Sequence, residues 1–221
     1  MKKQILLIAL MAASALGFAQ LKPSFGIRAG VTSSTMQGEA VNNLQDLIDY
    51  TKGGVTASSH TGFYAGANAS IPLSNIVSIE PGLYYAQKGY DMKGELNLKG
   101  IEFLGINGKA NLTSQYVDLP LLLKFNFNGL QFFAGPQVSY LAKANLRTTA
   151  GALGFNVFDR TMDATDQFNR WDAGVTGGIG YQFTNGFNIS AMYDLGLSRV
   201  DANQNVNSYN RSLKVGAGFR F

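Results

Sequence analysis

Hydrophobic and polar residues alternate with a period of two along most of this chain. In the clearest segment every second residue is apolar: Val117, Leu119, Leu121, Leu123, Phe125 and Phe127. Polar residues such as Asp118 and Lys124 occupy positions between them. Because successive side chains of a β-strand point to opposite faces, the pattern predicts a strand with one apolar and one polar face.

Eight segments show this alternation and predict eight strands. They cover residues 25–33, 61–71, 76–90, 117–127, 130–146, 170–183, 187–200 and 209–221. Each is long enough to cross a bilayer as a tilted strand, which needs about 9 to 11 residues. The last segment alternates up to an aromatic final residue, Phe221. An apolar outer face is a liability in water and a requirement in lipid, so this ending is typical of an outer-membrane strand.

The connections between the predicted strands alternate strictly between short and long. Short ones lie at 72–75, 128–129 and 184–186, and long ones at 34–60, 91–111, 147–169 and 201–208. This order predicts an all-β fold, an eight-stranded antiparallel up-and-down transmembrane β-barrel with short periplasmic turns and long extracellular loops. Both chain ends then lie in the periplasm, which forces an even number of strands.

Aromatic residues gather near the expected membrane boundaries. Those near the periplasm are Phe25, Phe125, Phe132, Phe183, Phe187 and Phe219, and those nearer the outside are Phe63, Tyr85, Tyr140 and Trp171. Such girdles form where amphipathic rings meet lipid headgroups. The alternative is a soluble β-sandwich with these rings in its core, but that fold requires neither the terminal aromatic residue nor the asymmetry of turns and loops.

The amino-terminal residues predict a secretory signal peptide. Lys2 and Lys3 precede an apolar run over 5–16, which is followed by Gly17, Phe18 and Ala19. The run is too short for a spanning helix, so we expect cleavage near Ala19, with residues 1–19 as signal peptide and 20–221 as the barrel domain of a Gram-negative outer membrane. A buried amino-terminal helix is the alternative. The chain has no cysteine, which excludes disulfides, a lipoprotein anchor and thiolate chemistry.

Charge is sparse and nearly balanced. Only 14% of the residues are charged, against about 25% in soluble domains. Removal of the predicted signal peptide takes away two of the 18 basic residues, which leaves 16 against 14 acidic ones. A nucleic-acid partner is therefore not expected. The 26 glycines and 12% aromatic residues favour a sheet protein.

Several short motifs follow one another in order along the chain. They are Ile79-Glu80-Pro81-Gly82-Leu83-Tyr84-Tyr85, Tyr116-Val117-Asp118-Leu119-Pro120-Leu121, Gly135-Pro136 before Tyr140, Asp172-Ala173-Gly174 leading to Gly178-Ile179-Gly180-Tyr181, and Gly218-Phe219-Arg220-Phe221. In this order the chain resembles the small outer-membrane-protein β-barrel domain family, which includes PorT-like and porin-like proteins. The resemblance implies an eight-stranded scaffold without shared catalytic residues. Some relatives assist a secretion machine and others are described as porin-like. An envelope or secretion-complex protein is therefore one partner that the resemblance allows, although the residues do not select among these roles.

Strand parity places eight charged residues inside the predicted barrel. These are Arg28, Glu80, Asp118, Lys124, Asp172, Asp194, Lys214 and Arg220, four of each sign. Because an eight-stranded barrel is just wide enough for its own side chains, we expect them to form a charge network that pairs across the lumen. A narrow, porin-like passive channel lined by the same charges is the alternative.

Catalytic residues and cofactors are not expected. The only histidine, His60, directly follows Ser58 and Ser59, and adjacent residues do not readily assemble a nucleophile and its base. Residues from other loops could still approach His60, which leaves a lipid-acting outer-membrane enzyme as the less favoured alternative.

No metal site or phosphate loop is expected either. Asp159, Asp163 and Asp166 lack the glycine and terminal glutamate of a calcium loop. Gly177, Gly178 and Gly180 are not followed by a helix pattern, so we interpret them as close-packed positions of a curved strand.

Recognition is expected to involve the loops, which a barrel presents on a rigid scaffold. Residues 37–52 carry apolar residues at helical spacing and predict a short amphipathic helix. This helix either packs over the barrel mouth or against the membrane interface, or it docks a partner protein. Outer-membrane lipid should surround the barrel. Phe219 and Phe221 should serve as the signal through which the barrel-assembly machinery binds the carboxyl-terminal strand. We therefore predict a structural or interaction role.

Overall fold

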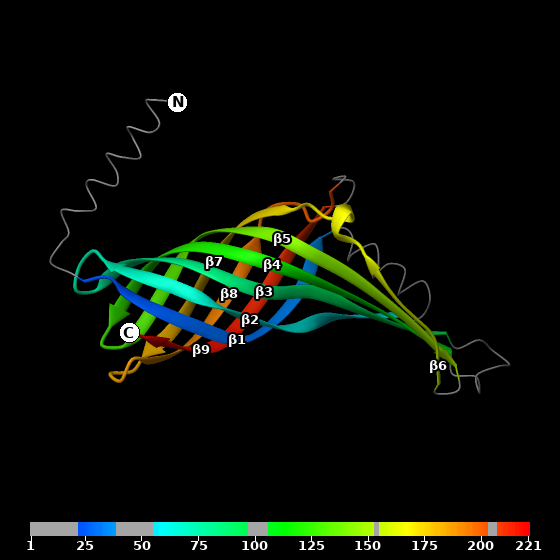
Figure 1. The fold of residues 1–221 in the computed structure, drawn as a ribbon, viewed down its shortest axis with the longest axis horizontal. Coiled ribbons are helices and arrows are strands. Elements are labelled where there is room, and N and C mark those ends of the chain that lie inside the picture. Colours follow the sequence, from blue (N-terminus) through cyan, green and yellow to red (C-terminus); the bar gives the residue numbers. More distant parts are fainter. Residues whose placement is uncertain (1–21, 39–54, 97–105, 153–154, 203–206) are drawn as a thin grey trace, which may run out of the picture.

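Eight strands close into a ring in the computed structural model, and a ninth strand lies outside it (Figure 1). The hydrogen-bonded order around the ring is β4-β3-β2-β1-β9-β8-β7-β5, and β4 pairs back onto β5. All of these pairings are antiparallel. The predicted eight-stranded antiparallel up-and-down barrel is thereby confirmed.

The structure describes residues 22–38, 55–96, 106–152, 155–202 and 207–221. Its strands are β1 (Ser24–Gly38), β2 (Val55–Pro72), β3 (Val77–Leu96), β4 (Ile106–Phe127), β5 (Leu130–Ala152), β6 (Phe155–Asp163), β7 (Trp171–Gln182), β8 (Phe187–Gly196) and β9 (Ser208–Arg220). A short 3-10 helix, η3 (Thr165–Gln167), follows β6. Within these residues we find no helix with the length and apolar character needed to cross a membrane.

Several strands run well past their predicted ends. The predicted loops 34–60 and 91–111 contain the ends of β1 and β3 and the beginnings of β2 and β4. The prediction of a loop over 147–169 was wrong for most of its length, because β5 continues to Ala152 and β6 pairs with it. Figure 1 shows β5 and β6 projecting beyond the ring at the end opposite the short turns.

The short turns have the backbone that their residues predict. Asn128 and Gly129 join β4 to β5 with φ angles of 50° and 96°. Positive φ at both central residues defines the type I′ turn, which matches the twist of the two strands and favours Asn-Gly. The Asn126 side chain accepts a hydrogen bond from the Gly129 N–H at 3.0 Å. The turn therefore fixes the register between β4 and β5.

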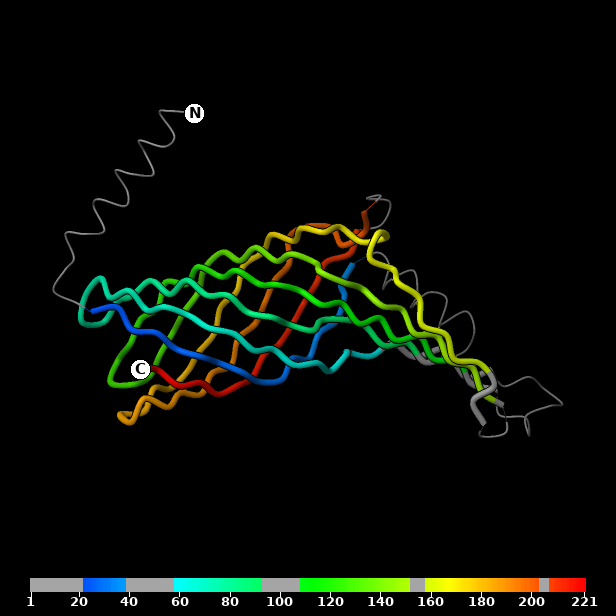
Figure 2. The backbone as a smooth tube through the Cα atoms, viewed as in Figure 1, coloured from blue at the N-terminus to red at the C-terminus, as the bar shows by residue number. Residues whose placement is uncertain are grey.

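The two faces of the strands separate as the alternation predicts. On β4, Leu119, Leu121 and Leu123 are exposed on the outside, whereas Asp118 and Lys124 are buried. The tube in Figure 2 shows β1 alongside β9, the pairing that closes the ring. The outer wall is thus apolar, and the inner wall carries the buried charges.

Aromatic side chains pair on the outer surface at both ends of the ring. Tyr140 and Trp171 lie 4.9 Å apart between ring centroids near the long-loop end. At the short-turn end Phe183 packs against Phe187 at 5.7 Å. These rings belong to the two groups that the sequence assigned to the membrane boundaries.

The ladder between β2 and β3 is interrupted between residues 59 and 64. Side chains of β1 replace the missing backbone partners there. The Thr32 hydroxyl donates to the carbonyl of Gln87 at 2.8 Å, and the Gly89 N–H donates to the Ser34 hydroxyl at 2.8 Å. Two buried hydroxyls therefore bind β1 to β3 across the gap.

The predicted amphipathic helix over 37–52 lies almost entirely outside the described residues. Gln37 itself belongs to β1. The predicted signal peptide, residues 1–19, also lies outside them.

Candidate functional site: the charged lumen

The Glu80 carboxylate, near the start of β3, holds two cations at the short-turn end of the lumen. Lys124 donates to its Oε2, and the Arg28 Nη2 lies 3.3 Å from its Oε1. Asn68 donates to the same Oε1 at 3.1 Å and to the Tyr84 hydroxyl at 2.9 Å. Arg28, Glu80 and Lys124 are all buried, so one carboxylate serves two desolvated positive charges. We call these three residues the lower cluster.

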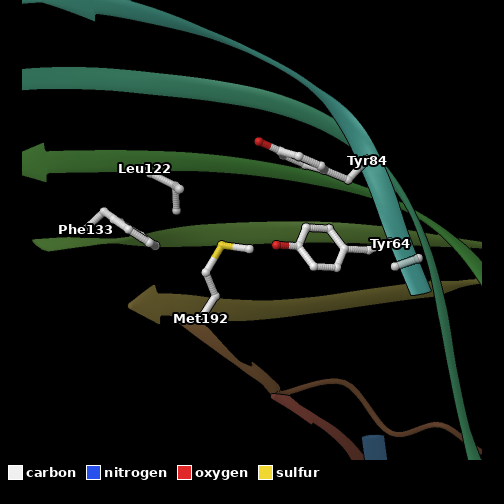
Figure 3. Close-up of a cluster of buried hydrophobic side chains, with 6 residues drawn as sticks. Tyr64, Tyr84, Leu122, Phe133 and Met192 are labelled. Carbon is white, nitrogen blue, oxygen red and sulfur yellow. The ribbon is translucent and has the colours of Figure 1, made fainter. Parts of the chain in front are cut away.

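Apolar side chains fill the middle of the lumen. Figure 3 shows Tyr64, Tyr84, Leu122, Phe133 and Met192 pointing toward one another from five different strands. The charged groups of Arg28 and Lys124 each lie 5.9 Å from the centroid of the Phe133 ring, within cation–π range. The barrel interior is therefore a packed core at this level.

A second cluster lies toward the long-loop end, around Asp118. Its Oδ1 is 2.9 Å from Lys88 Nζ and its Oδ2 is 2.7 Å from Lys214 Nζ. Lys214 also lies 2.6 Å from Asp194 Oδ2, and Lys88 donates to the Ser139 hydroxyl at 3.3 Å. Asp118 is 0% exposed. We call Lys88, Asp118, Asp194 and Lys214 the upper cluster.

The structure brings six of the eight predicted lumen charges into these clusters: Arg28, Glu80, Asp118, Lys124, Asp194 and Lys214. Asp172 is buried but accepts a hydrogen bond from the Asn210 amide at 2.9 Å rather than pairing with a cation. Arg220 is half-buried and makes no ion pair with any described residue. The sequence analysis missed Lys88. Lys88 and Glu80 are both even-numbered and lie on the same inward face of β3. The alternation along this strand was therefore enough to predict that Lys88 points into the barrel.

His60 has partners that its sequence neighbours did not indicate. Its Nδ1 lies 2.9 Å from Asp91 Oδ1 on β3, and its Nε2 lies 3.5 Å from the Thr113 hydroxyl on β4. Ser58 and Ser59 are exposed and take no part. Carboxylate, imidazole and hydroxyl in this order are the groups that orient, activate and supply a nucleophile in hydrolases.

The acidic residues of β6 and η3 are bound by neighbouring residues. Asp159 pairs with Arg147, Asp163 with Thr165, and Asp166 with Arg170. Hydrogen bonds from Arg147 hold the pKa of the Asp159 carboxyl below its ordinary range, and those from Thr165 do the same for the pKa of Asp163. In the described part of the chain no three His, Asp or Glu residues are grouped so that they could hold a metal ion.

Of the three glycines of β7 that the sequence predicts to be close-packed, Gly178 and Gly180 are. The prediction was wrong for Gly177, where a Cβ would meet nothing nearer than 3.5 Å. A Cβ on Gly178 would lie 2.2 Å from the Ala191 carbonyl oxygen and 2.8 Å from the Phe133 ring. One on Gly180 would lie 2.8 Å from the Ile189 carbonyl oxygen. Gly178 therefore leaves room for the aromatic ring that fills the lumen.

The carboxyl-terminal aromatic residues lie on the outer wall at the closing seam. Phe219 pairs with Ile27 of β1, and its ring lies 5.8 Å from that of Phe221. The Phe221 N–H donates to the carbonyl of Phe25 at 2.9 Å. Both terminal rings are exposed on the outside of the ring.

Comparisons with known proteins complete this picture. The family model described as "Outer membrane protein beta-barrel domain" matches residues 18–202. Among solved structures, Ail of Yersinia pestis is similar with a TM-score of 0.45 at 14% identity, over 91% of this chain and 100% of that chain. OprG of Pseudomonas aeruginosa is similar with a TM-score of 0.40 at 16% identity, over 90% of this chain and 95% of that chain. Neisserial surface protein A is similar with a TM-score of 0.38 at 16% identity, over 90% of this chain and 98% of that chain. No curated protein matches the chain.

Proposed function

Because the chain belongs to the outer membrane protein β-barrel domain family, we propose that it is a closed barrel with a structural or interaction role. Its location is the outer membrane, and its apolar outer wall contacts lipid. The observation that carries the proposal is the filled lumen. An open channel would need a continuous water path, whereas here two ion-paired clusters and an apolar layer lie one after another along the axis.

The packing of side chains in the lumen supports a barrel that is closed to ions rather than an ion channel. Tyr64, Tyr116, Leu141 and Lys124 are each at most 2% exposed, although they belong to the inner wall of the barrel. A barrel of about eight strands is expected to be filled by its own side chains. A cavity of about 10 Å³ beside Asp172 holds roughly one water molecule, which is too little for an ion path.

The interaction surface that we propose is the projecting hairpin of β5 and β6. It presents Phe158 and Met162, which are 47% and 43% exposed, on a strand that pairs only with β5 among the described residues. Apolar side chains on a rigid outer projection are suited to recognition. A partner in an envelope or secretion complex, as in the PorT-like branch of the family, is the class that we favour.

A hairpin replacement tests this role. Asn145 and Asp163 are paired, so substituting Asn-Gly for residues 146–162 should close the hairpin with a two-residue turn and leave the ring intact. Tagged parent and variant would be purified in mild detergent from the native outer membrane and their bound proteins identified by mass spectrometry. We expect a stoichiometric partner with the parent that is lost with the variant. Recovery of the parent alone would contradict the interaction role.

Delivery and insertion are further parts of the proposal. We expect cleavage near Ala19, which the intact mass of the mature protein would test.

Phe219 and Phe221 are proposed as the signal that the barrel-assembly machinery binds. Deleting Phe221 should lower the amount of folded barrel in cells while the purified chain still refolds in detergent, since its ring contacts only the outer surface. If the deletion lowered the yield of folded barrel equally in cells and in detergent, Phe221 would have a purely structural role.

A lipid-acting activity is the second candidate, and the geometry around His60 is the observation that favours it. Asp91 and Thr113 come from β3 and β4, so the arrangement does not depend on a loop. Ester hydrolysis by purified barrel in detergent, abolished by His60→Ala and by Thr113→Val, would support it. Hydrolysis that is absent, or indifferent to both substitutions, would remove this candidate.

A further inference from the structure

A small polar cavity lies inside the barrel at the long-loop end. Its volume is about 10 Å³, and its wall includes Lys88, Asp172, Asp194 and Ser212. The last three come from β7, β8 and β9, three neighbouring strands of the ring. A Cβ on Gly196 would lie 3.0 Å from Asp172 Oδ2, so the absence of a side chain there keeps this space open.

Three buried oxygen atoms of the cavity wall have no hydrogen-bonding partner among the described residues. They are Asp172 Oδ1, Asp194 Oδ1 and Ser212 Oγ, on side chains that are 8%, 5% and 1% exposed. The other carboxylate oxygens are satisfied, since Asp172 Oδ2 accepts from Asn210 at 2.9 Å and Asp194 Oδ2 lies 2.6 Å from Lys214. A buried polar atom without a partner destabilises the folded state, so three around one cavity indicate a ligand.

The charged residues around the cavity determine whether that ligand is a cation or an anion. Among the described residues, the carboxylates of Asp118, Asp172 and Asp194 face only two ammonium groups, those of Lys88 and Lys214. The formal balance at this end of the lumen is therefore one negative charge, and a buried charge needs a counter-charge. Both ammonium groups are already engaged by Asp118, with Lys88 also bound to Ser139.

We propose that this cavity binds one monovalent cation, with Na⁺ as the ion of suitable size. Asp172 Oδ1, Asp194 Oδ1 and Ser212 Oγ are its protein ligands. A single positive charge neutralises the cluster, whereas a divalent ion would reverse its sign next to two lysines. The volume admits about one water-sized species, which favours Na⁺ over larger cations. The ion connects β7, β8 and β9 where the ring meets its loops.

Sodium-dependent stability tests the proposal. Refolded barrel in neutral detergent would be heated in sodium chloride or in choline chloride at equal ionic strength, and the loss of the folded band followed on semi-native gels. We expect a midpoint about 3 °C higher in sodium, because a ligand that binds only the folded state stabilises it. Asp172→Asn removes the negative charge without changing the shape of the side chain and should abolish the difference.

Two further variants keep the result decisive. Ser212→Ala changes no charge and should weaken the sodium response, which guards against failure of Asp172→Asn to fold. Asp166→Asn removes an exposed carboxylate whose side chain is 96% exposed, so it should keep the full response. Equal midpoints of the parent in sodium and choline would overturn the proposal. So would a sodium response that persists in Asp172→Asn and Ser212→Ala, since the ion would then bind elsewhere.

Discussion

Glu80 is the single anion of the lower cluster, and two buried cations depend on it. Lys124 donates to one of its oxygens and Arg28 lies 3.3 Å from the other. Removing the carboxylate would leave both cations in a desolvated environment that also contains the Phe133 ring. The cost of such a change comes less from the lost attraction than from the charges left unpaired.

We therefore expect Glu80→Ala to lower the free energy of unfolding by about 3 to 5 kcal/mol, the usual cost of leaving a buried charge unpaired. The temperature at which the folded band disappears on semi-native gels would measure it. Asp166→Ala, on an exposed side chain, is the matched control and should leave that temperature unchanged. Equal behaviour of the two variants would show that the lower cluster does not stabilise the barrel.

Asp172 differs from Glu80 although the sequence places both on the inner wall. It accepts a hydrogen bond from Asn210 and has no lysine or arginine within ion-pair distance among the described residues. Asp172→Ala should consequently destabilise less than Glu80→Ala in sodium-free buffer, by the same gel measurement. A larger loss for Asp172→Ala would mean that the partners of these two carboxylates have been misassigned.

Parity along each strand predicts which charges face inward, but it does not predict their partners. The Lys214–Asp118 contact joins residues 96 positions apart, and the Arg28–Glu80 contact joins residues 52 apart. Such pairs depend on how far the strands are staggered around the ring, which no single strand reveals. The same holds for His60, whose partners come from two other strands.

At the scale of single elements, the Asn128-Gly129 turn depends on glycine. Gly129 has a φ of +96°, and a Cβ there would lie 2.7 Å from the Gln182 carbonyl oxygen. Gly129→Ala should cost about 1 to 3 kcal/mol because it combines a strained backbone with this contact. Gly108→Ala is the control, since its Cβ would meet nothing nearer than 4.0 Å. If both variants melted together with the parent, the proposed importance of the turn would be disproved.

The alternation of apolar and polar residues predicted neither the full length of the strands nor β6, and the reason is physical. A strand that crosses lipid needs an apolar face, which gives a clear period of two. Beyond the ring, the extension of β5 pairs with β4 on one side and with β6 on the other. Backbone hydrogen bonds hold these strands, and polar side chains such as Arg147 and Asp159 pair with each other. The alternation therefore fades where the lipid-facing wall ends, although the strands continue.

At the scale of the molecule, the two ends of the chain meet to close the ring. β1 pairs with β9 from Gly26–Arg220 to Gly38–Ser208, which leaves no free edge between them. The sequence predicted this closure through its strand count and its alternation of turns and loops. It also predicted a polar lumen, whereas the apolar layer of Tyr64, Phe133 and Met192 across it was not foreseen. That layer is central to the proposal of a closed barrel.

Electrical recording in a planar lipid bilayer tests closure most directly. Refolded barrel would be inserted at high salt and its current followed under applied voltage, with a refolded porin as the positive control for insertion. Because the clusters and the apolar layer occupy the lumen, we predict no single-channel steps above those of the protein-free bilayer. Reproducible steps of one size, altered by Lys214→Gln or Glu80→Gln, would contradict the closed barrel and identify a narrow channel through the charged lumen.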